Sequence, residues 1–159
     1  MRNGLEIRRA RGGDESLVAA LLRELAEYER LTDKFFLTEE RIRSDFFEAH
    51  AVFCDIGFAN AELVGLATWY WTYSSFRAVR GIYLEDLYIR PQFRGRKFGK
   101  ALLAHLAKTA LDGNGGYVGW SVLDWNRNSI AFYDSLGAEP VRGWTDYRLE
   151  GAAFAALAR

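Results

Sequence analysis

The chain has 159 residues, half of them hydrophobic, and its 21 Lys and Arg residues equal its 21 Asp and Glu residues. This length suits one domain with a hydrophobic core, so we expect a single domain over residues 1–159. A net charge near zero argues against nucleic acid as an obligate partner, because such binding rests on a clear positive excess. The sequence shows no apolar stretch long enough for a membrane and no apolar signal core, and we therefore expect a cytoplasmic protein without a membrane partner.

The first half of the chain predicts three strands and two helices. Alternating residues from Leu5 to Arg9 predict a short strand, and leucines at helical spacing after Asp14, the expected N-cap, predict a helix. Thr38 is the expected cap of a second helix. Two strands joined by a turn follow at residues 51–58 and 63–73.

The second half predicts further mixed elements. We expect strands at residues 80–89, 117–122, 138–141 and 144–149, and helices at residues 98–111 and from Asn126 or Asn128 to 136. Strands and helices that share one core predict an α/β (α+β) fold, with a mixed, largely antiparallel central sheet and helices on both faces.

Cysteine and histidine usage argues against a metal cofactor. The sequence has one cysteine, Cys54, which excludes an intramolecular disulfide and a Cys-based metal site. Its apolar surroundings predict a small core residue. His50 and His105 have no metal-ligand spacing, and we expect no metal.

The most informative stretch is residues 83–100, where a predicted strand runs through a basic, Gly-containing loop into a helix. Backbone N–H groups and the helix N-terminus favour an anion there, and four basic side chains add positive charge. These side chains are Arg94, Arg96, Lys97 and Lys100. Because Glu85 and Asp86 lie just upstream, the pattern predicts a phosphate-bearing cofactor whose reactive end meets a carboxylate.

The loop lacks the P-loop and dinucleotide patterns. Arg94-Gly95-Arg96-Lys97-Phe98-Gly99 instead resembles the acetyl-CoA loop of the GNAT N-acetyltransferases, Gln/Arg-x-x-Gly-x-Gly/Ala, although Lys97 stands where that family usually has Gly. A second stretch, residues 125–138, resembles the late motif of the same family, in which an Asn opens a helix and a Tyr precedes Gly-Ala.

Further stretches resemble one subgroup, the diamine (spermidine/spermine) acetyltransferases, which includes thialysine acetyltransferases. They are residues 25–29, 37–39, 69–73 and 83–86, and the whole resemblance runs from about Leu5 to Leu149. It implies the GNAT fold, acetyl-CoA as co-substrate, a small-molecule primary amine as acceptor, and a homodimer.

The resemblance also implies roles for individual residues. Glu85 would be the base, directly or through a water, and Tyr133 the general acid that protonates the leaving thiolate. Backbone groups of Leu87, Tyr88 and Ile89 would bind the pantetheine arm. The pyrophosphate would be bound by Arg94, Gly95, Arg96, Lys97, Phe98, Gly99 and Lys100, and the distal part of the cofactor by Asn126 and Ser129. Tyr28, Glu29, Glu85 and Asp86 would line the amine pocket.

Each role has a structural alternative. Glu85 and Asp86 could pair with Arg80 or Arg90, and a regular strand would point the two acids to opposite faces unless a β-bulge intervened. Tyr133 could be a core aromatic. Asn126 could be simply a helix cap.

One departure bears on the amine. Polyamine-specific relatives carry an acid after the Thr-Tyr of the third strand, where this chain has Ser74, which favours a short diamine or basic amino acid. Arg77 and Arg80 could meet a substrate carboxylate or lie as surface charges. Two other functions remain open at this point: acetylation of a protein or peptide amine, and a CoA-binding sensor without catalysis.

Overall fold

The computed structural model describes residues 4–159. The chain divides into two compact units, one ending at Ser121 and one beginning at Val122, and each is described by itself. The expectation that residues 1–159 form a single domain stays a prediction.

The first unit is built on a five-stranded sheet in the order β1-β2-β3-β4-β5. The strands are β1 (Leu5–Arg9), β2 (Phe53–Ala59), β3 (Glu62–Ser74), β4 (Val79–Ile89) and β5 (Gly115–Gly119). The first four pair antiparallel, and β5 alone runs parallel to its neighbour. The prediction of a mixed, largely antiparallel sheet is confirmed.

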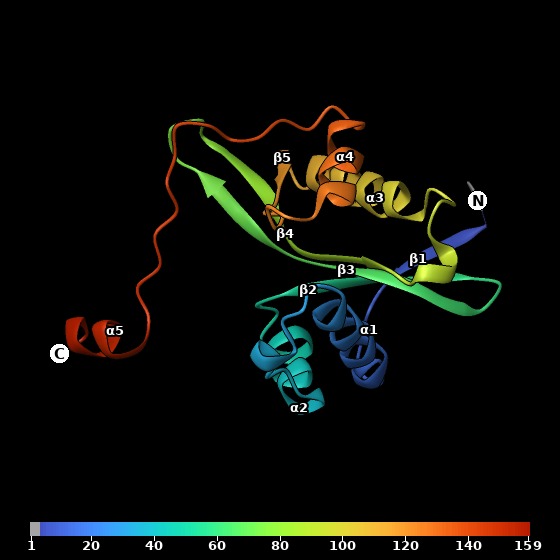
Figure 1. Ribbon diagram of the computed structural model, residues 1–159, viewed down its shortest axis with the longest axis horizontal. Helices are drawn as coiled ribbons and strands as arrows, with labels where there is room; N and C mark the ends of the chain where they lie inside the picture. The colour runs from blue at the N-terminus through green and yellow to red at the C-terminus, as the bar shows by residue number, and fades with distance from the viewer. Residues whose placement is uncertain (1–3) are drawn as a thin grey trace. The chain divides into compact units, whose positions relative to one another are not determined.

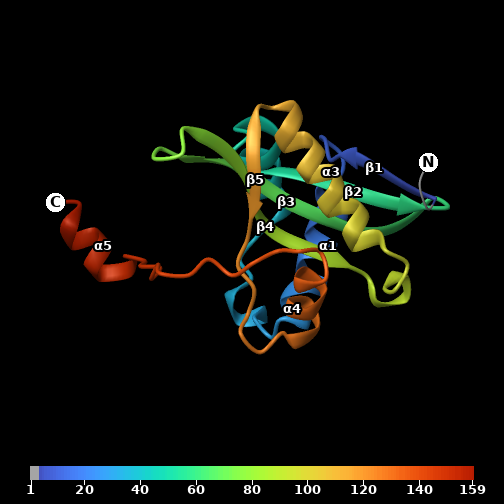
Figure 2. The ribbon, with the colours of Figure 1, turned by 90° about the horizontal axis from the view of Figure 1, so that it is seen from above.

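Helices cover both faces of this sheet (Figures 1 and 2). On one face lie α1 (Glu15–Tyr28), α2 (Glu39–Ile42) and the π-helix η2 (Arg43–Glu48); on the other lies α3 (Phe98–Asp112). Two short 3₁₀ turns, η1 (Thr32–Lys34) and η3 (Pro91–Phe93), complete the unit.

The α1 face holds a core in which the helix leucines pack on the sheet. Leu21 and Leu25 of α1 share this cluster with Cys54, Leu66 and Tyr88 of the strands. The helical spacing read from the sequence therefore marks the buried stripe of α1, as expected for an amphipathic helix. Burial also raises the pKa of the Cys54 thiol, which agrees with its expected place in the core.

The α3 face combines an apolar layer with one buried carboxylate. Asp55 is 1% exposed and accepts hydrogen bonds from Arg9 Nε at 2.8 Å and from the Trp69 indole at 2.7 Å. These donors compensate the burial of the charge. The His105 ring of α3 lies 3.6 Å from the same carboxylate, so α3 meets the sheet at a satisfied polar centre.

One of the two N-caps expected in this unit forms its capping hydrogen bond, and the other does not. The Thr38 hydroxyl accepts from the Arg41 N–H, as predicted. Asp14 holds the N-cap position of α1, but its carboxylate accepts from the Arg11 N–H and the Arg8 guanidinium instead. The predicted strand at residues 117–122 begins earlier, because Gly115 pairs with Arg80 of β4.

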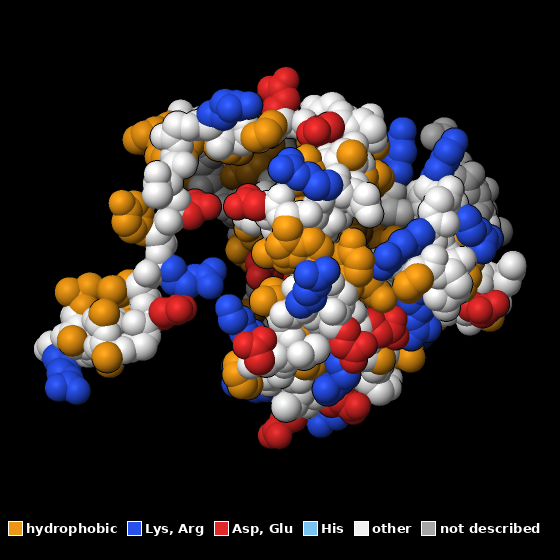
Figure 3. Space-filling view, viewed as in Figure 1, with side chains coloured by type: hydrophobic (Ala, Val, Ile, Leu, Met, Phe, Trp, Pro, Cys, Tyr) orange, Lys and Arg blue, Asp and Glu red, His pale blue; other side chains and the backbone are white. Residues whose placement is uncertain are grey.

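The second unit contains α4 (Arg127–Asp134) and α5 (Gly151–Leu157). The strands predicted at residues 138–141 and 144–149 are wrong, since this unit contains no strand among its described residues, 122–159. A strand needs a neighbour for its N–H and C=O groups, and this segment has none within the unit. The helix α5 was not predicted; Figure 3 shows apolar side chains on it.

Candidate active site

The loop before α3 has the geometry of an anion site. Gly95 and Lys97 adopt left-handed backbone conformations, with φ of 75° and 64°. Lys97 is the N-cap residue of α3, and its side chain forms no capping hydrogen bond. The first N–H groups of a 15-residue helix therefore point outward with the positive end of its dipole. The left-handed φ of Lys97 also explains why Gly suits this position.

The side chains of this loop divide their roles. Phe98 is 2% exposed and packs in the core below α3, which leaves its backbone for any ligand contact. Arg96 lies over the rings of Phe93 and Phe98. Arg94 lies over Tyr28 and donates from Nε to the Ile89 carbonyl at 2.9 Å. Lys97 and Lys100 are exposed.

The second part of β4 has an open edge. The ladder with β5 ends at the pair Tyr83 and Gly119. From Leu84 to Ile89, β4 is hydrogen-bonded to β3 alone within the first unit. A strand-like ligand could add to this edge through main-chain hydrogen bonds. The Tyr88 side chain is turned away into the α1 core, so its contribution there would be backbone.

A β-bulge in β4 sets the direction of the two acids. Thr68 lies opposite Asp86, whereas the next residue of β3, Trp69, lies opposite Leu84. Glu85 is therefore the extra residue, without a partner on β3. Such a bulge interrupts the alternation of side chains and re-aims one of them.

Three carboxylates, Glu29, Glu85 and Asp86, are named here the acidic site, because the charges of Glu85 and Glu29 act on Asp86. Burial, opposed by a hydrogen bond from Thr68 and assisted by the charges of Glu85 and Glu29, raises the pKa of Asp86 to about 6. Burial also raises the pKa of Glu29, which follows the last residue of α1.

Neither arginine expected as an alternative partner neutralises these acids. Arg90 pairs with Glu24 at 2.8 Å. Arg80 stacks on Trp71, with 3.6 Å from the guanidinium carbon to the ring centre, and Arg77 lies over Tyr117. Among residues 4–121, no Lys or Arg forms an ion pair with the acidic site.

Aromatic rings flank the acids. Tyr70 stacks on Tyr83 with ring centres 5.2 Å apart, and the Tyr83 hydroxyl lies 2.9 Å from the Ser121 hydroxyl. Burial, followed by the charges of Glu85 and Tyr83, raises the pKa of Tyr70. Carboxylates beside aromatic rings form a site suited to an ammonium group on an alkyl chain.

The remaining candidates belong to the second unit. Asn126 caps α4, because its side-chain oxygen accepts from the Ser129 N–H at 3.2 Å. Tyr133 lies on the last turn of the same helix, beside Phe132, with ring centres 5.3 Å apart. The capping role of Asn126 is therefore confirmed, and a cofactor role would be additional.

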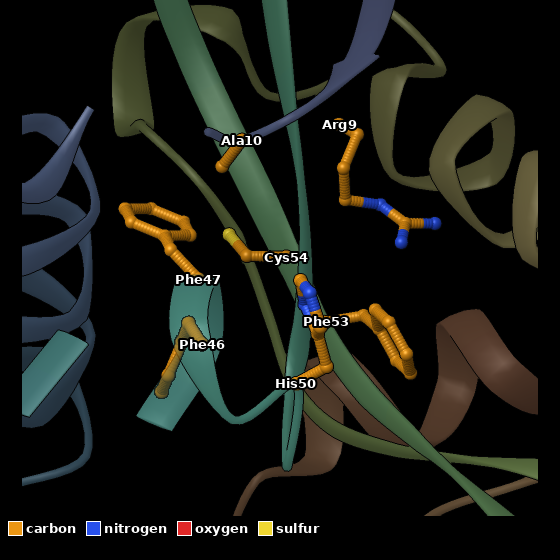
Figure 4. A pocket seen from close by; sticks show the side chains of 7 residues that line it. All are labelled: Arg9, Ala10, Phe46, Phe47, His50, Phe53 and Cys54. Atoms are coloured by element: carbon orange, nitrogen blue, oxygen red, sulfur yellow. The ribbon is translucent and has the colours of Figure 1, made fainter. Parts of the chain in front are cut away.

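A small pocket elsewhere in the first unit contains none of these candidates (Figure 4). It has a volume of about 120 Å³ and is lined by Arg9, Ala10, Phe46, Phe47, His50, Phe53 and Cys54. This is below the roughly 300 Å³ at which ligand pockets begin. Among residues 4–159 no group of three or more His, Cys, Asp or Glu side chains could hold a metal.

Sequence reasoning missed Thr68, Tyr70 and Tyr83. Thr68 is fully buried opposite Asp86, and the two tyrosines stack across neighbouring strands. One signal was present: Thr68 is a lone hydroxyl in the buried run Val64 to Trp69. What it bonds depends on the β3–β4 register, which the sequence does not display.

The comparisons with known proteins agree with this geometry. The model of the acetyltransferase (GNAT) family matches residues 17–138. A thialysine N-epsilon-acetyltransferase of Bos taurus is 37% identical, over 96% of each chain. An L-ornithine N5-acetyltransferase of Arabidopsis thaliana is 29% identical, over 95% of this chain and 86% of that one. An integron cassette protein from V. cholerae superposes with a TM-score of 0.82 at 25% identity, over 98% of each chain.

The chain belongs to the acetyltransferase (GNAT) family. It is an N-acetyltransferase, and acetyl-CoA is the co-substrate of this family.

Proposed function

We propose that this chain transfers an acetyl group from acetyl-CoA to a primary amine of a small basic amino acid or diamine, by direct attack in a ternary complex. The observation that carries the proposal is the acidic site at β4 and the end of α1, whose carboxylates form no ion pair with a Lys or Arg within residues 4–121. Glu29 and Asp86 are partly buried, and burying a carboxylate without a counter-ion is costly, so a bound ammonium would offset that cost.

The co-substrate fits the residues that are present. The outward N–H groups of α3, the left-handed turn at Gly95 and Lys97, and the basic side chains of the loop suit a pyrophosphate. The open edge of β4 from Leu84 to Ile89 suits the extended arm. When bound, acetyl-CoA supplies an acetyl thioester, whose C–S bond breaks as the new N–C bond forms.

The chain's own residues manage the protons. Glu85, directly or through a water, accepts a proton from the substrate ammonium and so frees the nitrogen lone pair. Asp86 and Glu29 balance the charges of the amine. Tyr133 donates its phenolic proton to the departing sulfur, because a phenol is protonated at neutral pH, and it regains a proton from the second one that the nitrogen loses as the amide forms. The remaining acceleration comes from holding amine and thioester together.

The relatives favour amino acids with a second amine as acceptors. Two relatives are named for thialysine and for L-ornithine, and both matches extend over nearly the whole chain. The absence of an acid at Ser74 points the same way, since a long polycation would meet fewer carboxylates.

Thiol release from acetyl-CoA tests this function. The purified chain is given acetyl-CoA with thialysine, lysine, ornithine, putrescine, spermidine or spermine in turn, and with lysine-containing peptides. We expect rapid release with at least one small amine. Release with peptides alone would favour the protein acetyltransferase alternative. Binding of acetyl-CoA without release with any amine would favour the sensor.

Three further expectations stay predictions: a homodimer, a cytoplasmic location, and no nucleic-acid or membrane partner. Exposed aromatics on the β3–β4 hairpin support an interface between copies, with Tyr73 65% and Phe76 97% exposed. Sedimentation velocity of the wild type and of Phe76→Ser would test the dimer. No helix among residues 4–159 is long and apolar enough to cross a membrane.

A further inference from the structure

Thr68 is an unusual residue for the centre of β3. It is 0% exposed, it stands opposite Asp86, and its hydroxyl donates to the Asp86 Oδ2 atom. An ionised carboxylate can only accept, so the hydroxyl must be the donor when Asp86 is charged. The bond therefore ties one carboxylate oxygen of Asp86 to β3 and does not use the other.

The β-bulge in β4 makes the hydrogen bond between Thr68 and Asp86 important for the direction of both acids. Because Glu85 is the extra residue, Asp86 stays in register with Thr68 while Glu85 is released from the ladder. Asp86 is therefore held by Thr68, whereas the side chain of Glu85 takes a different direction from the one a regular strand would give it. The charge of Glu85 raises the pKa of both Asp86 and Tyr70, so Glu85 lies near the held carboxylate and near the Tyr70 ring.

The groups facing Asp86 leave Thr68 as its main stabilising contact. Glu85 on the same strand and Glu29 at the end of α1 are negative, and Cys54 on β2 is a buried thiol. Burial and the two negative charges raise the pKa of Asp86, and the Thr68 hydrogen bond lowers it. Within residues 4–121, no cation pairs with Asp86.

We propose that Thr68 is a positioning residue for the acetyl transfer: it holds Asp86 beside the bulged Glu85, so that both carboxylates meet the substrate ammonium together. This inference rests on the proposed function. Thr68 touches neither the amine nor the thioester and takes no proton in the reaction. It acts through Asp86, by fixing the direction of its carboxylate and by favouring the charged form at neutral pH.

Replacing Thr68 by Val tests the inference, since Val keeps the shape and removes the hydroxyl. We expect the acid limb of the kcat/KM profile, measured between about pH 5 and pH 9, to move up by about one unit. At about pH 5, below both pKa values, kcat/KM should fall roughly tenfold, which corresponds to that one-unit displacement. The affinity for acetyl-CoA, measured by calorimetry, should stay within about twofold, because the loop before α3 is untouched.

Two variants serve as controls. Thr68→Ser keeps the donor and should keep the wild-type acid limb. Thr72→Val makes the same change on the same strand and face, where the partner is Gly81 rather than an acid, and should leave the limb unmoved. If Thr68→Val does not fold, Thr68→Cys, with a much weaker donor, must give the displaced limb.

The outcomes separate this inference from the function on which it rests. A wild-type limb in Thr68→Val, or in Thr68→Cys if that variant is used, would overturn the positioning role and leave the acetyltransferase intact. A displaced limb in Thr72→Val would overturn it too, because the effect would then not be specific to Asp86. Failure of the wild type to release thiol with any amine would overturn both.

Discussion

The guanidinium of Arg94 lies over the ring of Tyr28, with 4.8 Å between the guanidinium carbon and the ring centre. The same side chain donates from Nε to the Ile89 carbonyl. Arg94 thus joins the end of α1, next to Glu29 of the acidic site, to the end of β4 and the loop before α3. The residue expected to bind pyrophosphate is also the contact that connects the two halves of the candidate site.

Replacing Arg94 by Lys should therefore weaken amine binding. Lys keeps the charge but loses the planar stacking and the Nε bond. We expect the KM for the amine to rise roughly threefold to tenfold, with the acetyl-CoA affinity changed less. Arg96→Lys, which alters stacking on Phe93 and Phe98 instead, should leave the amine KM near wild type. An unchanged KM for the amine in Arg94→Lys would contradict the proposal that Arg94 connects the two halves of the candidate site.

Gly99→Val should block the approach of the pyrophosphate to the first turn of α3. We expect the acetyl-CoA affinity, measured by titration calorimetry, to fall at least about tenfold, because the outward N–H groups become covered. Ala104→Val is the matched control, since it adds a β-branched residue at an exposed position of the same helix. Equal acetyl-CoA affinity in the Gly99 variant and the wild type would remove this loop from the cofactor site.

Tyr133→Phe removes only a hydroxyl. If Tyr133 is the general acid, turnover should drop about 10- to 100-fold while the acetyl-CoA affinity stays nearly constant. Tyr147→Phe in the same unit, at a 94% exposed residue, is the control and should behave as wild type. Unaltered turnover, measured where chemistry limits the rate, would exclude Tyr133 from proton transfer.

Asp86→Asn should stabilise the protein while lowering its activity. The pKa of Asp86 is raised to about 6 from its ordinary 3.8, so the ionised form costs stability in the folded state. The wild type therefore loses stability as pH rises from about 4 to about 6, and Asn does not. We expect a gain of about 1–3 kcal/mol at neutral pH that disappears below about pH 4.

Denaturant unfolding of both proteins at several pH values gives the measurement. Asn accepts the Thr68 hydrogen bond as Asp does, so the comparison isolates the charge. The opposite trend, with the wild type gaining on the variant as pH rises, would show that Asp86 is stabilised by its surroundings.

Ser74→Asp should shift the preference towards longer polyamines. Ser74 lies four residues from Tyr70 on the same face of β3, or about 13 Å along the strand. A new acid there would offer a partner to a distant ammonium. We expect the kcat/KM ratio of spermine to a short diamine or lysine to rise about tenfold. A wild type that already prefers spermine would invalidate our interpretation of Ser74.

The helices α1 to α4 and the basic, Gly-containing loop before α3 could be predicted because their signals are local. Leucine spacing marks the buried stripe of α1, Thr38 and Asn126 cap the helices that follow them, and residues 94–100 combine glycine with positive charge before a helix. Each signal depends on residues within one or two turns of one another. Local chemistry was therefore enough to predict an anion site and the elements around it.

The arrangement of the acids was decided by the tertiary structure. Whether Glu85 and Asp86 share a face depends on the bulge between Thr68 and Trp69, and the open edge of β4 depends on where pairing with β5 ends. Strand register follows from packing on both faces of the whole sheet, so residues within one strand do not display it. For the same reason the strands expected at residues 138–141 and 144–149 were wrong, because a strand forms only where a neighbour is available to pair with it.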